Sequence, residues 1–140
     1  MKFGIYSDAG ELTCGGEPGS YGFEEIDAET FANWGVDFLK YDFCHVPQEE
    51  NEAKSRYLRM SKALQNSGRE ILFSMSEWGV CNGYKWGENT GATMWRTTLD
   101  LTDYWDRPTE HTNRGNSIKT IFDLQMGLQK YQKPGCYNDP

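Results

Sequence analysis

A cation, a carboxylate and a thiol follow one apolar run within five residues, Lys40-Tyr41-Asp42-Phe43-Cys44. Residues two apart on a β-strand share a face, so Lys40 and Asp42 are expected to point the same way. A nearby ammonium keeps a carboxylate ionised, which suits a nucleophile. A second carboxylate, Asp100, follows the run Trp95-Arg96-Thr97-Thr98. Two such acids are the minimum requirement for cleaving a glycosidic bond.

An alternation of strands and helices is expected to position these residues. The hydrophobic pattern predicts strands at residues 2–7, 36–41, 71–75, 94–97 and 136–137. It predicts helices at residues 27–34, 49–65, 89–93 and 117–131. Asp27 and Ser117 are the predicted N-caps, and Gly68 is predicted to end the second helix. Tyr57 lies on the apolar side of that helix and is predicted to belong to the core.

An acid stands at the end of each predicted strand: Asp8, Asp42, Glu77, Asp100 and Asp139. Their spacings are 34, 35, 23 and 39 residues, against roughly 31 residues for one strand–helix unit of a TIM barrel. The pattern therefore predicts an α/β fold that is part of a (β/α)8 barrel, with its site at the C-terminal ends of the strands. A five-stranded doubly wound sheet is the second possibility.

The two ends of the sequence also bear on the domain organisation. The chain starts inside a predicted strand and stops after the fifth strand, with no helix to cover it. Because parallel sheets are covered on both faces, residues 1–140 are expected to be part of a single catalytic barrel that is truncated at both ends.

The composition narrows the classes of partner. The 140 residues are 37% hydrophobic, and 14 basic against 21 acidic side chains give a net charge of −7. This balance, without a basic run, argues against binding to nucleic acid or to an anionic membrane surface, and favours a neutral substrate. No run of about 18 apolar residues is present, so no membrane span is predicted. The first residues are too polar for a signal peptide.

The four cysteines, Cys14, Cys44, Cys81 and Cys136, form no CxxC pair, so no zinc site and no other metal site is predicted. Cys14 and Cys44 each follow a predicted strand, and they could form a bridge if those strands are neighbours. Four buried free thiols are the alternative. The histidines, His45 and His111, are isolated and are predicted to be exposed loop residues. No cofactor is implied, because proton transfer and covalent attack need only carboxyl groups.

Four segments together resemble the α-galactosidases of glycoside hydrolase family 27. They are residues 2–14, which start Lys-Phe-Gly-Ile-Tyr-Ser-Asp-Ala-Gly; residues 34–44 around Lys40-Tyr41-Asp42; residues 95–105 around Trp95-Arg96-Thr97-Thr98; and Asn138-Asp139-Pro140. They occur in the order of the family and cover nearly the whole chain. The resemblance implies that the chain holds about strands three to seven of the eight-stranded barrel.

The resemblance also implies residue roles. Asp42 would be the nucleophile and Asp100 the acid/base, and Cys14 and Cys44 would form the disulfide of the family. Sugar-binding roles would fall to five residues: Tyr6, Lys40 and Arg96 on the galactose hydroxyls, and Glu77 with Trp78 at the 2-position. Two features depart from the family. Ser76 replaces the usual cysteine before Glu-Trp, and Cys81 and Cys136 match no family role.

The activity implied is that of a retaining exo-glycosidase that removes terminal α-galactosyl residues by double displacement. The alternatives are a β-L-arabinopyranosidase, an α-N-acetylgalactosaminidase, or a carbohydrate-binding fragment without turnover. Galactosides are the expected partners, and a secreted, periplasmic or lysosomal-type compartment is expected. An arginine beside the acid/base would oppose its protonation, so Arg96 is expected to face mainly a sugar hydroxyl or another acid. Asp8 is expected to brace the rim of the barrel.

Overall fold

The computed structural model describes residues 1–106 and 115–140. The strands and longer helices, in chain order, are β1 (Gly4–Asp8), α1 (Glu24–Asn33), β2 (Phe38–Asp42), α2 (Glu50–Asn66), β3 (Leu72–Ser76), β4 (Met94–Arg96), α3 (Ile118–Gln125) and β5 (Tyr137–Asp139). Three single turns of 3₁₀ helix lie between them: η1 (Gly83–Lys85), η2 (Gly87–Thr90) and η4 (Gln129–Tyr131). Within these described ranges, no helix combines the length and apolar character needed to cross a membrane.

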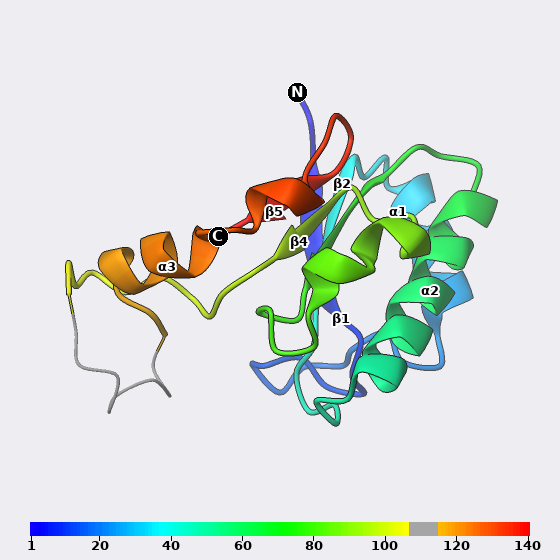
Figure 1. The fold of residues 1–140 in the computed structure, drawn as a ribbon. Helices are drawn as coiled ribbons and strands as arrows, with labels where there is room; N and C mark the ends of the chain where they lie inside the picture. The colour runs from blue at the N-terminus through cyan, green and yellow to red at the C-terminus, as the bar shows by residue number, and fades with distance from the viewer. Residues whose placement is uncertain (107–114) are drawn as a thin grey trace.

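The five strands form one parallel sheet in the order β1-β2-β3-β4-β5 (Figure 1). Each strand pairs with the next one in the sequence. A doubly wound sheet reverses its strand order at a switch point, whereas a barrel adds its strands in succession. The sequential order therefore excludes the doubly wound alternative and confirms the prediction of a partial (β/α)8 barrel.

The two faces of the sheet have different surroundings. Helices α1 and α2 lie on the same side of the sheet, whereas α3 lies beyond its β4–β5 end (Figure 1). Side chains that point toward the helices are buried, namely Leu39, Tyr41, Phe73, Met75 and Trp95. Alternate residues point to the opposite face, which corresponds to the inside of a barrel. This inner face carries the predicted site residues of β1, β2 and β4.

The boundaries of two helices differ from those predicted. Helix α1 begins at Glu24, three residues before the predicted N-cap Asp27, because the buried carboxylate of Glu24 accepts hydrogen bonds from the Gly22 amide and from Arg59 of α2. Helix α3 stops at Gln125 because Gly127 adopts a φ of +86°, and only the turn η4 follows. Ser117 is the N-cap of α3 as predicted, since its hydroxyl accepts from the Thr120 amide.

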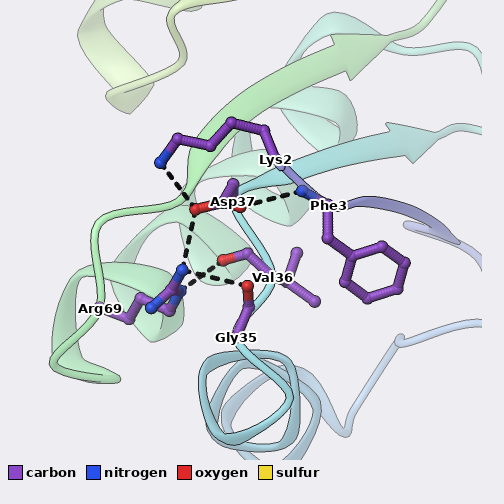
Figure 2. Close-up of polar contacts among 6 residues, drawn as sticks. All are labelled: Lys2, Phe3, Gly35, Val36, Asp37 and Arg69. Atoms are coloured by element: carbon purple, nitrogen blue, oxygen red, sulfur yellow. Dashed lines mark hydrogen bonds and ion pairs between the residues drawn. The ribbon is translucent and has the colours of Figure 1, made fainter.

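An ion-pair network holds the N-terminal edge of the sheet (Figure 2). The carboxylate of Asp37 accepts from the Lys2 ammonium and from the Phe3 amide, both at 2.9 Å, and from the Arg69 guanidinium at 2.8 Å. Arg69 also donates to the carbonyl oxygens of Val36 and Gly35. The hydrogen bond from the Phe3 amide, followed by the hydrogen bond from the Lys2 side chain, lowers the pKa of Asp37 to about 2. The network therefore connects the start of β1, the start of β2 and the segment that precedes β3.

Candidate active site

Asp42 is the last residue of β2, and its side chain points to the inner face of the sheet together with Lys40. Its carboxylate is buried (6% exposed) and accepts from the Phe43 amide at 3.2 Å. Lys40 pairs in register with Tyr6 of β1, and its ammonium lies 5.9 Å from the centre of the Tyr6 ring. Among the described residues, Lys40 forms no ion pair with Asp42. The Lys40 ammonium is therefore available to bind a ligand the size of a sugar.

Tyr6 contacts both the Lys40 ammonium and the Asp8 carboxylate. Its hydroxyl donates to the Asp8 carboxylate at 3.4 Å. Desolvation, followed by the negative charges of Asp42 and Asp8, raises the pKa of Tyr6 well above its ordinary value. The hydroxyl thus remains protonated and can donate a hydrogen bond.

Asp8 braces the rim of the sheet, as expected. It is fully buried, and its carboxylate accepts from the amides of Gly10 at 2.7 Å and Cys44 at 3.1 Å. Desolvation raises its pKa to about 6, and the nearby Asp42 adds to this effect, while the two amides oppose it. Through Cys44, Asp8 fixes the loop that leaves Asp42.

The disulfide between Cys14 and Cys44 is present and joins the loops that follow β1 and β2. One ligand atom from each of Asp8, Cys14, Asp42 and Cys44 lies within 4.8 Å of the others. This cluster has the appearance of a metal site, but the disulfide consumes both sulfur ligands. The Asp8 and Asp42 carboxylates therefore lie close to each other beside the disulfide. The other two cysteines, Cys81 and Cys136, are buried and free.

Glu77 directly follows β3, at the strand end where the sequence placed it. Its side chain is fully buried, and its carboxylate accepts hydrogen bonds from three backbone amides of the following loop, those of Gly79, Cys81 and Gly83. Desolvation raises the pKa of Glu77, and the three amides oppose this shift. These bonds tie Glu77 to the loop and fix its orientation, and its role at the 2-position of a sugar stays a prediction.

The two residues that flank Glu77, Ser76 and Trp78, have features that are typical of functional sites. Trp78 has a φ of +58°, which is unusual for a residue with a side chain, and its ring is partly exposed where it packs against the core. Ser76 pairs in register with Asp42, and its buried hydroxyl has no hydrogen-bond partner among the described residues. Such backbone conformations and unpaired polar groups concentrate at functional sites.

Arg96 and Asp100 form an ion pair, with Nη1 2.9 Å from Oδ1. The guanidinium is nearly buried (11% exposed), whereas the Asp100 side chain is 74% exposed. The expectation that Arg96 faces mainly a sugar hydroxyl or another acid is therefore wrong for this structure. The two residues lie four apart in the sequence, Arg96 as the last residue of β4 and Asp100 in the segment that follows it. The Nε atom of Arg96 is buried and has no partner among the described residues.

Both predicted catalytic acids lie at the same edge of the sheet. Asp42 ends β2, and Asp100 follows β4 by four residues, so both are at the C-terminal ends of parallel strands with β3 between them. This edge is where barrel enzymes carry their active sites. Asp42 is held rigidly by its buried surroundings, whereas Asp100 stands on an exposed loop.

Comparison with known proteins agrees with this arrangement. A family model described as alpha galactosidase A (Melibiase_2) matches residues 1–140. The chain belongs to the alpha-galactosidase A family. It is 43% identical to alpha-galactosidase A of Cellvibrio japonicus, over 99% of this chain and 34% of that protein. It is 46% identical to alpha-galactosidase 2 of Arabidopsis thaliana, over 100% of this chain and 32% of that protein.

Solved structures give the same result. The alpha-galactosidase of Saccharomyces cerevisiae with raffinose matches with a TM-score of 0.91 and 36% identity, over 99% of this chain and 34% of that chain. A β-L-arabinopyranosidase from Geobacillus stearothermophilus shares the fold at a TM-score of 0.66, with 20% identity. This member of the alpha-galactosidase A family spans about a third of the length of the relatives named above.

Sequence reasoning missed two supporting residues. Asn138 accepts from the indole of Trp95 at 2.8 Å and donates to the Leu128 carbonyl, so it secures β4 below the Arg96–Asp100 pair. Tyr57 was predicted to be core, and it is, but its hydroxyl also contacts two strand ends. The signal in the sequence was the hydroxyl itself, since a buried tyrosine needs a hydrogen-bond partner.

Proposed function

We propose that residues 1–140 form part of the catalytic barrel of a retaining α-galactosidase, which extends beyond both ends of this segment. The observation that carries the proposal is the position of Asp42, a buried carboxylate at the C-terminal end of β2 with Lys40 and Tyr6 beside it. The same edge holds a second acid, Asp100, in a chain whose whole length matches the alpha-galactosidase A family. This supports two acids in different roles.

In the proposed first step, Asp42 attacks the anomeric carbon and forms a galactosyl ester, while the bond to the leaving oxygen breaks. Asp100 gives its proton to that oxygen. In the second step Asp100, now ionised, takes a proton from water, and the resulting hydroxide displaces Asp42 with a second inversion. The two inversions retain the α configuration. Because Asp100 is paired with Arg96 in the free protein, its use as a proton donor requires this pair to reorganise when substrate binds.

The remaining inner-face residues are proposed to bind the sugar. Lys40 and Tyr6 offer hydrogen-bond donors to the galactose hydroxyls, and Arg96 offers its unpartnered Nε once the ligand is present. Trp78 offers a flat apolar surface to the ring. Glu77 is proposed, with Trp78, to contact the 2-position, and the backbone amides that bind its carboxylate would hold it in one orientation.

A galactoside is the substrate class best supported. The relatives at 43% and 46% identity are named alpha-galactosidases, and the yeast structure contains raffinose, which carries a terminal α-galactosyl unit. The β-L-arabinopyranosidase is only 20% identical and lends support to the fold alone. The proposed compartment is oxidising, because the Cys14–Cys44 disulfide would not persist in a reducing one.

Chemical rescue with azide can test the two acid roles separately in the complete catalytic domain. With 4-nitrophenyl α-galactoside as substrate, Asp42→Gly is expected to lower kcat on the order of 10³-fold or more. Azide should then restore turnover by attacking from the vacated side, which gives the β-galactosyl azide. Asp100→Ala is expected to accumulate the ester on Asp42, and azide should release it from the other side as the α-galactosyl azide.

The stereochemistry of the products, followed by NMR, decides the result. The unmodified enzyme should release α-galactose first. Release of β-galactose would rule out double displacement, and exchanged azide products would reverse the two roles. Galactose binding without any turnover would favour the alternative of a carbohydrate-binding protein.

A further inference from the structure

Tyr57 of α2 brings a hydroxyl to the C-terminal ends of β2 and β3. The side chain is fully buried. Its hydroxyl donates to the carbonyl oxygen of Tyr41 at 3.2 Å and accepts from the amide of Ser76 at 3.3 Å. Tyr41 directly precedes Asp42, and Ser76 pairs with Asp42 in register. One hydroxyl therefore contacts the backbone of β2 directly before the proposed nucleophile and the backbone of β3 directly beside it.

The register shows what these two backbone groups are. The Leu72 amide donates to the Asp37 carbonyl at 2.9 Å. In a parallel pair such bonds recur every two residues on each strand, so the Ser76 amide and the Tyr41 carbonyl face each other as the last position of the β2–β3 ladder. Tyr57 supplies a donor and an acceptor where the two strands separate into their loops.

The surroundings of Tyr57 fix this hydroxyl in place. Four aromatic rings surround that of Tyr57, with centroids 5.8 to 6.2 Å away: Tyr41, Phe43, Phe73 and Trp86. Burial raises the pKa of Tyr57 well above 10, so the hydroxyl keeps its proton and remains a donor. A rotamer change would require the surrounding rings to move as well.

The other side of Asp42 is secured separately. Its carbonyl accepts from the Ala9 amide at 2.9 Å, across the β1–β2 pair. The end of β2 is thus held by β1 on one side, and on the other by β3 through the bridging hydroxyl. A displacement of β2 relative to β3 would move the Asp42 carboxylate relative to any sugar bound at this edge, and productive geometry tolerates only about 0.5 Å.

We infer that Tyr57 is a positioning residue for the nucleophile: its hydroxyl sets the separation of the β2 and β3 ends and thereby the location of Asp42. The inference rests on the proposed function and deepens it. Tyr57 touches neither substrate nor the reacting atoms, so its effect should appear in kcat while KM changes little.

The test uses Tyr57→Phe in the complete catalytic domain, because this change keeps the ring and removes only the hydroxyl. With 4-nitrophenyl α-galactoside, well below the unfolding temperature, kcat is expected to fall at least 10-fold, with KM within about two-fold of the parent value. Ser67→Ala is the matched control. It removes a hydroxyl-to-carbonyl hydrogen bond, to Leu64 at 2.7 Å, from the C-terminal end of the same helix, and it should leave kcat and KM unchanged.

A kcat for Tyr57→Phe within two-fold of the parent value, in a folded protein, would overturn the inference and leave Tyr57 as a core residue only. If Tyr57→Phe does not fold, 4-aminophenylalanine at position 57 replaces it. This residue keeps a donor for the Tyr41 carbonyl but accepts poorly from the Ser76 amide. Its kcat is expected to be at least three-fold below the parent, and parent activity would equally overturn the inference. An inactive parent enzyme would instead overturn the proposed function.

Discussion

Asp8 and Asp42 occupy paired positions at the ends of neighbouring strands, yet their surroundings differ. Asp8 is fully buried and bound to two backbone amides, whereas Asp42 lies beside an uncommitted lysine and a tyrosine hydroxyl. The different surroundings therefore give Asp8 a structural role and leave Asp42 available for the proposed reaction. The sequence already distinguished the two residues, because only Asp42 has a cation two positions before it on the strand.

The raised pKa of Asp8 makes a testable contribution to stability. Its folded pKa of about 6 exceeds the ordinary 3.8, so the favourable contribution is complete below pH 3.8 and is lost as the pH rises through 6. Asp8→Asn removes this titration while it keeps an oxygen for the Gly10 and Cys44 amides. The free energy of unfolding of the parent, minus that of the variant, should fall between pH 4 and 6 by up to about 3 kcal/mol.

Urea unfolding of both proteins at pH 4, 5, 6 and 7 measures this difference. Other titrating groups are common to the two proteins and cancel in the subtraction. A difference that stays constant across this range would show that Asp8 is not protonated preferentially in the folded state.

The network around Asp37 shows how the N-terminal edge of the sheet is assembled from separate elements. It joins the start of β1, the residues before β2 and the segment before β3 through one carboxylate (Figure 2). The folded pKa of about 2 lies below the ordinary 3.8. Its contribution to stability is therefore present above pH 3.8 and lost as the pH falls through 2.

Asp37→Asn is expected to lower the melting temperature at pH 7, and its effect should shrink between pH 4 and 2. Calorimetry of the complete domain across this range measures the change. Glu50→Gln is the matched control, because the Glu50–Lys54 pair is exposed on α2 and exposed pairs contribute little. Equal effects of the two substitutions at pH 7 would contradict a special role for Asp37.

The elements also show what could be predicted from the sequence. Strand order, strand type and the disulfide followed from periodic apolar runs, strand-end acids and the family resemblance. The start of α1 did not, because it depends on a tertiary contact between Glu24 and Arg59 of α2. The orientation of Glu77 did not either, because it depends on the path of a loop whose amides turn inward. The start of α1 is thus decided by a residue distant in the sequence, and the orientation of Glu77 by the path of the loop that follows it.

At the scale of the whole molecule, the Cys14–Cys44 disulfide joins the first two strand–helix units at the proposed catalytic edge. It spans 30 residues of sequence, and closing a loop of that size stabilises a fold by about 3 to 4 kcal/mol through the unfolded state. Cys14→Ser combined with Cys44→Ser should therefore lower the free energy of unfolding by about that amount.

Guanidinium unfolding with and without reductant measures the effect of the disulfide. Reductant should bring the parent protein to the level of the double variant and leave the variant itself unchanged. A parent protein insensitive to reductant would show that the bridge adds nothing to stability. A further loss in the variant would assign the sensitivity to another disulfide in the complete protein.

The Asp37 network lies immediately before the first residue of β2, and Asp42 is the last residue of this strand. The two are separated by roughly 16.5 Å, for five steps along the strand at about 3.3 Å each. The Asp37 network and the proposed catalytic carboxylate are therefore held at opposite ends of one short strand. Under the proposed function, substitutions at Lys40, Trp78 or Arg96 would alter the sugar site without touching the Asp37 network. Variants with a new sugar preference are therefore expected to keep the stabilisation that this network contributes.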